Sequence, residues 1–100
     1  MNINISSLHF KADKKLEDFI EQKIEKLTKV YDNIIGAEVI LKIENGEKPE
    51  NKSVDMRIKI KGYDTLADKT AKTFEEAVDL CIEALKKQLT KVKEKERSRP

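Results

Sequence analysis

The chain has 100 residues, of which 21 are basic and 19 acidic, so 40% of the residues carry a charge. This length predicts one domain with a modest core rather than two domains. Five aromatic residues and no tryptophan argue against a broad platform for stacking unpaired bases. The only cysteine, Cys81, excludes an internal disulfide and fits a reducing compartment.

The N-terminal residues have neither a basic segment nor an apolar run of signal length, and no stretch is apolar enough to cross a membrane. We therefore expect a cytoplasmic protein. Residues 1–6 alternate, with Ile3 and Ile5 on one face, which predicts a first strand.

A helix is predicted within residues 11–33, with Asp13 as its N-cap. Its apolar stripe at helical spacing consists of Leu16, Phe19, Ile20, Ile24, Leu27 and Tyr31. Gly36 ends this pattern. Residues 37–44 then alternate as a second strand, with one face formed by Val39, Leu41 and Ile43.

Residues 44–52 predict a polar turn, because they contain an Asn-Gly pair and Pro49. Residues 53–62 predict a third strand with Val54, Met56, Ile58 and Ile60 on one face and Asp55, Arg57, Lys59 and Lys61 on the other, facing water. Residues 64–69 predict a short fourth strand.

A long helix is predicted over residues 73–96, because Thr73 and Glu76 have the spacing of a capping box. Its apolar stripe consists of Phe74, Ala77, Val78, Cys81, Ile82, Leu85, Leu89 and Val92. The order β-α-β-β-β-α predicts an α+β fold, a two-layer sandwich in which both helices pack on one face of a four-stranded sheet. We expect one domain over residues 1–95 and a disordered basic tail over residues 96–100.

No constellation of residues indicates an enzyme. One histidine, His9, and one cysteine do not provide a metal site or a Cys–His pair, and three glycines do not form a phosphate-binding loop. Cys81 falls in the middle of an apolar stripe, which favours a core residue over a nucleophile. We expect His9 to lie in a turn, and we expect neither a metal nor a cofactor.

The basic residues gather at one end of the chain. Residues 86–99 hold seven bases and two acids, whereas the rest of the chain has more acids than bases. Lys87, Lys91 and Lys95 recur along one flank of the second stripe, and Lys86 and Lys93 line the other.

On the first helix, Lys23, Lys26 and Lys29 recur at a spacing of three. Lys23 falls within the apolar stripe, where folding alone favours an apolar residue. Two interpretations of these lysines stay open. They form a solvated face whose late positions complement the helix dipole, or they bind the phosphates of a structured RNA.

The chain resembles the family of ribosome hibernation promoting factors and ribosome-associated inhibitor A. The resemblance rests on the opening MNINISSLHF, on Lys23-Ile24-Glu25-Lys26-Leu27, on AEVILKIE, and on FEEAVDLCIEALKKQLTKVKEK, in that order over almost the whole chain. It implies a fold similar to that of double-stranded-RNA-binding domains. It also implies a translation inhibitor that occupies the mRNA and tRNA channel of the small ribosomal subunit and preserves idle ribosomes in stationary phase or stress.

The resemblance implies that Lys23, Lys26, Lys87 and Lys91 contact ribosomal RNA, and proximity on the helical wheel adds Lys29, Lys86, Lys93 and Lys95. Ala84, Glu75 and Thr90 depart from the family's pattern, which affects the expected RNA contacts and not the fold. The chain resembles the short forms, which lack a C-terminal dimerisation domain.

The expected partners are the small ribosomal subunit and its RNA, with no membrane and no small-molecule substrate, and we expect a monomer off the ribosome. One alternative is a protein-interaction module that binds an acidic partner through a sheet edge or the second helix. Another is a protein that binds free double-stranded RNA.

Overall fold

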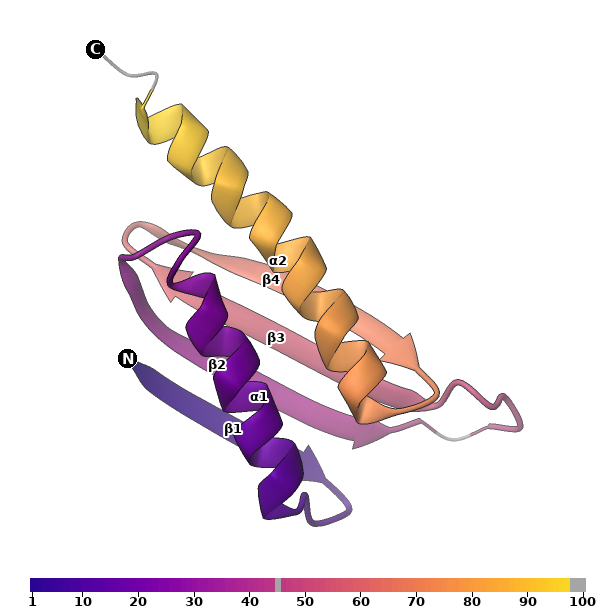
Figure 1. Cartoon of the computed structure of the whole chain (residues 1–100). Coiled ribbons are helices and arrows are strands. Elements are labelled where there is room, and N and C mark those ends of the chain that lie inside the picture. The colour runs from indigo at the N-terminus through magenta and orange to yellow at the C-terminus, as the bar shows by residue number, and fades with distance from the viewer. Residues whose placement is uncertain (45, 98–100) are drawn as a thin grey trace.

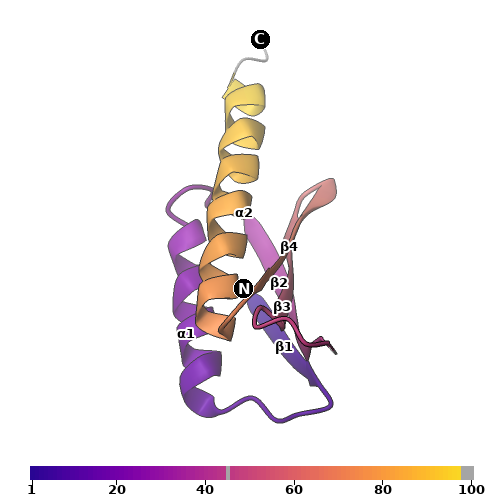
Figure 2. The same cartoon turned by 90° about the vertical axis from the view of Figure 1, so that its right-hand side faces the viewer.

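The computed structural model describes residues 1–44 and 46–97. The elements are β1 (Asn2–Leu8), α1 (Lys14–Leu27), β2 (Ile34–Ile43), β3 (Lys52–Ile60), β4 (Tyr63–Ala71) and α2 (Phe74–Arg97). The strands form one sheet in the order β1-β2-β3-β4. Both helices lie side by side on one face of this sheet (Figures 1 and 2). The predicted α+β sandwich is therefore confirmed.

The sheet combines one parallel pair with an antiparallel meander. β1 pairs in parallel with β2, so α1 serves as the crossover between them, and β2, β3 and β4 pair in antiparallel order. Gly36 lies within β2, opposite Asn2. It was expected to end the helical pattern of the first helix, but that helix ends earlier, at Leu27. A Cβ at residue 36 would lie 3.0 Å from the carbonyl oxygen of Asn2, so glycine permits this close pairing.

The core lies between the sheet and the two helices. Alternation in β3 works as predicted, because the side chains of Val54, Met56, Ile58 and Ile60 are all buried. The two helical stripes meet this face, with the buried set Ile20, Ile24, Leu27, Ala77, Val78, Cys81, Ile82, Leu85 and Leu89. Ile43, expected on the inner face of β2, is 45% exposed near the end of the strand.

Side-chain caps fix where the helices begin. The Asp13 carboxylate accepts a hydrogen bond from the Leu16 amide at 2.8 Å, and the Thr73 hydroxyl accepts one from the Glu76 amide at 3.1 Å. Both predicted caps are confirmed. They orient α1 and α2 over the sheet from their first turns.

The ends of the elements differ from the prediction. α1 ends at Leu27, so Tyr31 is buried outside the helix rather than in its stripe. The Thr28 amide and hydroxyl both bond to the Glu25 carbonyl, which closes the last turn. β4 is longer than predicted, and α2 reaches Arg97, one residue past the predicted end of the helix and two residues past the expected domain boundary at residue 95. Residues 98–100 of the expected tail lie outside the described residues.

Candidate nucleic-acid interface

A groove of about 570 Å³ lies between α1 and α2 and brings together four of the eight predicted lysines. Because both helices bury their stripes against one sheet face, the flanks of the stripes meet. The floor includes the apolar side chains of Leu27 and Ile82. The lysines that line this groove, here called the groove lysines, are Lys23, Lys26, Lys29 and Lys86. The acids in the lining are Asp79 and Glu83.

Lys23 crosses the groove and joins the two helices. Its side chain is 29% exposed, and its Nζ lies 3.1 Å from Oδ1 of Asp79 on α2. The same ammonium lies 5.3 Å from the centre of the Phe19 ring. The half-buried placement agrees with its position in the apolar stripe. Because Asp79 is about half exposed, this ion pair contributes little to stability.

Lys93 extends the row of groove lysines along α2. It lines a small hollow together with Lys29, Val30, Thr90 and Glu94. The structure thus places a cation of α2 beside Lys29, which lies in the turn after α1 rather than on the helix as predicted. Five of the eight predicted lysines therefore lie along the junction of the two helices.

The other three predicted lysines lie elsewhere on α2. Lys87, Lys91 and Lys95, here called the ridge lysines, continue the row begun by Leu80 and Ala84 and line none of these hollows. All three are exposed. They lie on a different flank of α2 from Lys86 and Lys93, as the spacing predicted.

Most of these ammonium groups are available to an anion. Within the part of the chain that the structure describes, no ion pair engages Lys26, Lys29, Lys86, Lys87, Lys91 or Lys93. A surface of this kind neutralises phosphates spaced along a nucleic-acid backbone. The arrangement favours recognition of phosphate and shape over recognition of bases, since among the residues that the structure describes no exposed row of aromatic rings accompanies the lysines.

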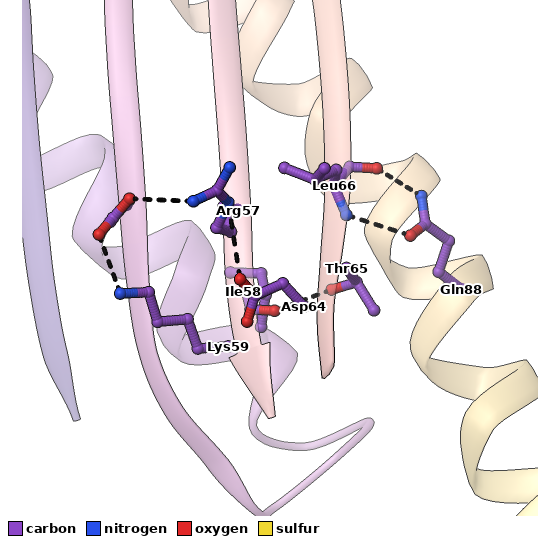
Figure 3. Close-up of polar contacts among 8 residues, drawn as sticks. Arg57, Ile58, Lys59, Asp64, Thr65, Leu66 and Gln88 are labelled. Carbon is purple, nitrogen blue, oxygen red and sulfur yellow. Dashed lines mark hydrogen bonds and ion pairs between the residues drawn. The ribbon is translucent and has the colours of Figure 1, made fainter. Parts of the chain in front are cut away.

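Gln88 orients α2 on the edge of the sheet. Its side-chain Nε2 donates to the Leu66 carbonyl at 2.7 Å, and its Oε1 accepts from the Leu66 amide at 3.3 Å (Figure 3). The amide therefore pairs with β4 as a neighbouring strand would. Sequence reasoning missed this contact, because nothing local distinguishes Gln88 from a solvent-exposed glutamine.

Arg57 and Lys59 on the outer sheet face are paired, unlike most of the lysines of the helix layer. The Lys59 ammonium donates to Glu38 at 2.9 Å, and Arg57 lies 3.7 Å from both Glu38 and Asp64 (Figure 3). The Lys59 hydrogen bond, with the charges of Lys59 and Arg57, lowers the pKa of Glu38. These two cations are already compensated, so the helix layer offers more ammonium groups without an ion-pair partner among the described residues.

A hollow of about 430 Å³ on the outer face contains an acidic pair that the sequence analysis did not identify. Asp55 and Asp68 lie opposite each other on β3 and β4, between the exposed side chains of Ile40 and Leu66. One carboxylate oxygen of Asp55 is buried without a hydrogen-bond partner. Burial and the neighbouring Asp68 raise the pKa of Asp55. The register of β3 against β4 creates this pair, so only the fold reveals it.

The remaining candidate residues have structural roles. Cys81 is fully buried, and burial raises the pKa of its thiol to about 12, which makes it a poor nucleophile. His9 lies in the turn after β1 with φ of 67°. Among residues 1–44 and 46–97, no cluster of three metal-binding side chains exists, and no helix is long and apolar enough to span a membrane.

Comparison with known proteins matches most of the chain to one family. The model of a family described as Sigma 54 modulation protein / S30EA ribosomal protein matches residues 3–97. A ribosome hibernation promoting factor from Pseudomonas putida is 29% identical over 98 residues, covering 98% of this chain and 92% of that protein.

Two solved structures are similar to this chain. A ribosomal subunit interface protein from Coxiella burnetii has a TM-score of 0.82 at 26% identity, covering 93% of this chain and 98% of that one. The N-terminal domain of Protein Y from Thermus thermophilus has a TM-score of 0.78 at 17% identity, covering 92% and 99% respectively, and shares the fold.

Proposed function

Because the chain belongs to the family of Sigma 54 modulation protein / S30EA ribosomal protein, we propose that it is a ribosome hibernation factor that inhibits translation. In this proposal it binds the small ribosomal subunit with its helix layer and occupies the channel used by mRNA and tRNA. The names of its relatives, a ribosome hibernation promoting factor and a ribosomal subunit interface protein, support a ribosomal partner. The role needs neither catalysis nor a cofactor.

The observation that carries this proposal is the set of ammonium groups on the helix layer, of which Lys26, Lys29, Lys86, Lys87, Lys91 and Lys93 take part in no ion pair within the described residues. The groove lysines and Lys93 provide one row of cations, and the ridge lysines provide another on a different flank of α2. Two rows on different flanks suit a folded RNA, whose backbone segments approach a protein from several directions. Binding releases counterions from the phosphates, which provides the affinity.

Inhibition follows from occupancy alone. The described part of the chain extends 52 Å along its longest axis, and in the proposal a bound copy occupies a channel that otherwise holds nucleic acid. In the proposal, mRNA and tRNA are excluded sterically while the subunit itself stays intact. The protein then preserves idle ribosomes in the cytoplasm during stationary phase or stress, and it is a monomer when it is off the ribosome.

Co-sedimentation with purified small subunits across a salt series tests this function. We expect saturation near one copy per subunit, and we expect each phosphate contact to contribute about −0.7 to −0.9 to the slope of log K against log salt, so that removing a contact makes the slope shallower by that amount. Reversing two ridge charges, Lys87→Glu with Lys91→Glu, should therefore reduce the slope by about 1.4 to 1.8 and weaken binding at least tenfold.

A matched variant separates specific contacts from net charge. Lys48→Glu with Lys61→Glu makes the same charge change at exposed positions on the two loops that join the sheet strands. We expect this variant to bind nearly as well as the wild-type protein, and both variants to keep the wild-type circular dichroism spectrum. Equal loss of binding in the two variants would show that the interaction is a non-specific electrostatic attraction.

The alternative is a module that binds an acidic protein, which the first part of the family description, sigma 54 modulation, favours. The same exposed lysines would then pair with carboxylates rather than phosphates. Nuclease treatment distinguishes the two. A complex isolated from lysate that survives complete digestion of RNA supports a protein partner, whereas its loss supports the ribosome.

A further inference from the structure

The last turns of α2 lie beyond the hydrophobic core. Leu89 is the last fully buried side chain of the helix, and Val92 is only half buried. The yellow end of α2 extends past the sheet and past α1 (Figures 1 and 2). A helix end without apolar contacts opens easily, so another interaction has to keep residues 93–96 in place.

One long-range contact holds this end. The Tyr31 hydroxyl donates a hydrogen bond of 2.8 Å to Oε1 of Glu96, across 65 residues of sequence. The tyrosine is a firm anchor, because its ring is only 5% exposed and its amide bonds to the Leu27 carbonyl at 2.9 Å. The contact therefore joins the end of α2 to the segment that follows α1.

The same contact fixes the direction of Lys93. This lysine precedes Glu96 by three residues, so the two side chains share a face of α2. Lys93, Tyr31 and Glu96 line one small hollow, and Lys93 also lines the adjoining hollow with Lys29. A helix end released from Tyr31 would no longer hold Lys93 beside Lys29, in the segment that follows α1.

We propose that Tyr31 and Glu96 are positioning residues that hold the end of α2 so that Lys93 continues the row of groove lysines. This inference rests on the proposed function, because it assigns Lys93 a phosphate contact. It also accounts for an acid among the basic residues of this helix end, where charge alone favours a base. In this proposal, the gain in phosphate binding from positioning Lys93 is larger than the loss caused by the negative charge of Glu96.

The substitution Tyr31→Phe tests the contact without changing net charge or removing the buried ring. In the free protein, amide hydrogen exchange of residues 93–96 should accelerate about tenfold, as expected when a hydrogen bond to a charged acceptor is lost. Tyr63→Phe is the matched control, because the Tyr63 side chain lies at the start of β4 and is about half exposed. It should leave this exchange unchanged.

Binding to small subunits then tests the role, with Tyr31→Phe, Lys93→Gln and the double variant. Lys93→Gln should reduce the salt slope by about 0.7 to 0.9, and Tyr31→Phe should reduce it by most of that amount. In the Lys93→Gln background, Tyr31→Phe should have no further effect. Additive losses would show that Tyr31 acts through general stability, which overturns the inference.

The remaining outcomes are separable. If the wild-type protein binds the subunit and Lys93→Gln binds with the same salt slope, this inference is overturned and the proposed function stands. Absence of any saturable binding by the wild-type protein overturns both. Unchanged amide exchange in Tyr31→Phe overturns the positioning role independently of the ribosome.

Discussion

Replacing Lys23 by methionine separates folding from binding at the most constrained of the predicted lysines. The variant loses the ion pair with Asp79, worth about 0.2–1 kcal/mol for a partly exposed pair, and a cation–π contact with Phe19 worth about 0.5–1 kcal/mol. It gains an apolar end group at a position that is only 29% exposed, at about 0.8 kcal/mol for each buried methylene equivalent. The terms nearly cancel, so the free energy of unfolding should change by less than about 1 kcal/mol.

Binding should change although stability does not. Loss of one phosphate contact reduces the salt slope by about 0.7 to 0.9 in the co-sedimentation assay. Urea unfolding measures stability, and Lys15→Met provides a control on an exposed part of α1 outside the groove. A fall in unfolding free energy of more than about 2 kcal/mol would show that Lys23 serves the fold. Unchanged binding would show that Lys23 makes no phosphate contact in the interface.

Three further predictions concern groups outside the lysines. Cys81 should react with a thiol reagent at pH 8 only on unfolding, because it is buried and its pKa is about 12. Asp68→Asn should raise stability at pH 7 by up to about 1 kcal/mol. Because the pKa of Asp55 is raised, the native state loses stability as pH rises through that pKa, and the variant should lose less between pH 4 and 7 in thermal melts. Gln88→Ala should lower the unfolding free energy by about 1–2 kcal/mol and accelerate exchange of the Leu66 amide, whereas a full loss of exchange protection in the core would contradict a local role.

The elements could be predicted because their signals are local. Apolar alternation in β3 and the Thr73 cap of α2 depend only on neighbouring residues, and both predictions are confirmed. The end of α1 was not predicted, because Tyr31 continues the helical spacing of apolar residues past Leu27. The hydrogen bond from Thr28 that closes the last turn has no signal in that spacing. Spacing identified Lys86 as a flank position but not the helix that it would face.

Long-range relations account for what the sequence did not reveal. The groove requires the docking of α1 against α2, and the Tyr31–Glu96 contact joins residues far apart in the chain. The pairing of Asp55 with Asp68 depends on strand register, which a shift of one residue would abolish. Spacing alone divided the lysines of the second helix between two flanks, but only the packed helices show which of these flanks faces the lysines of α1.

The parallel pairing of β1 also determines when the fold can close during synthesis. β1 is made first, but Asn2 pairs with Gly36 and Leu8 pairs with Lys42, each 34 residues later in the chain. β1 therefore waits without its partner until α1 and most of β2 have been made. Neighbours β2, β3 and β4 can pair through short connections as they appear, so β1 joins an assembly that it does not start.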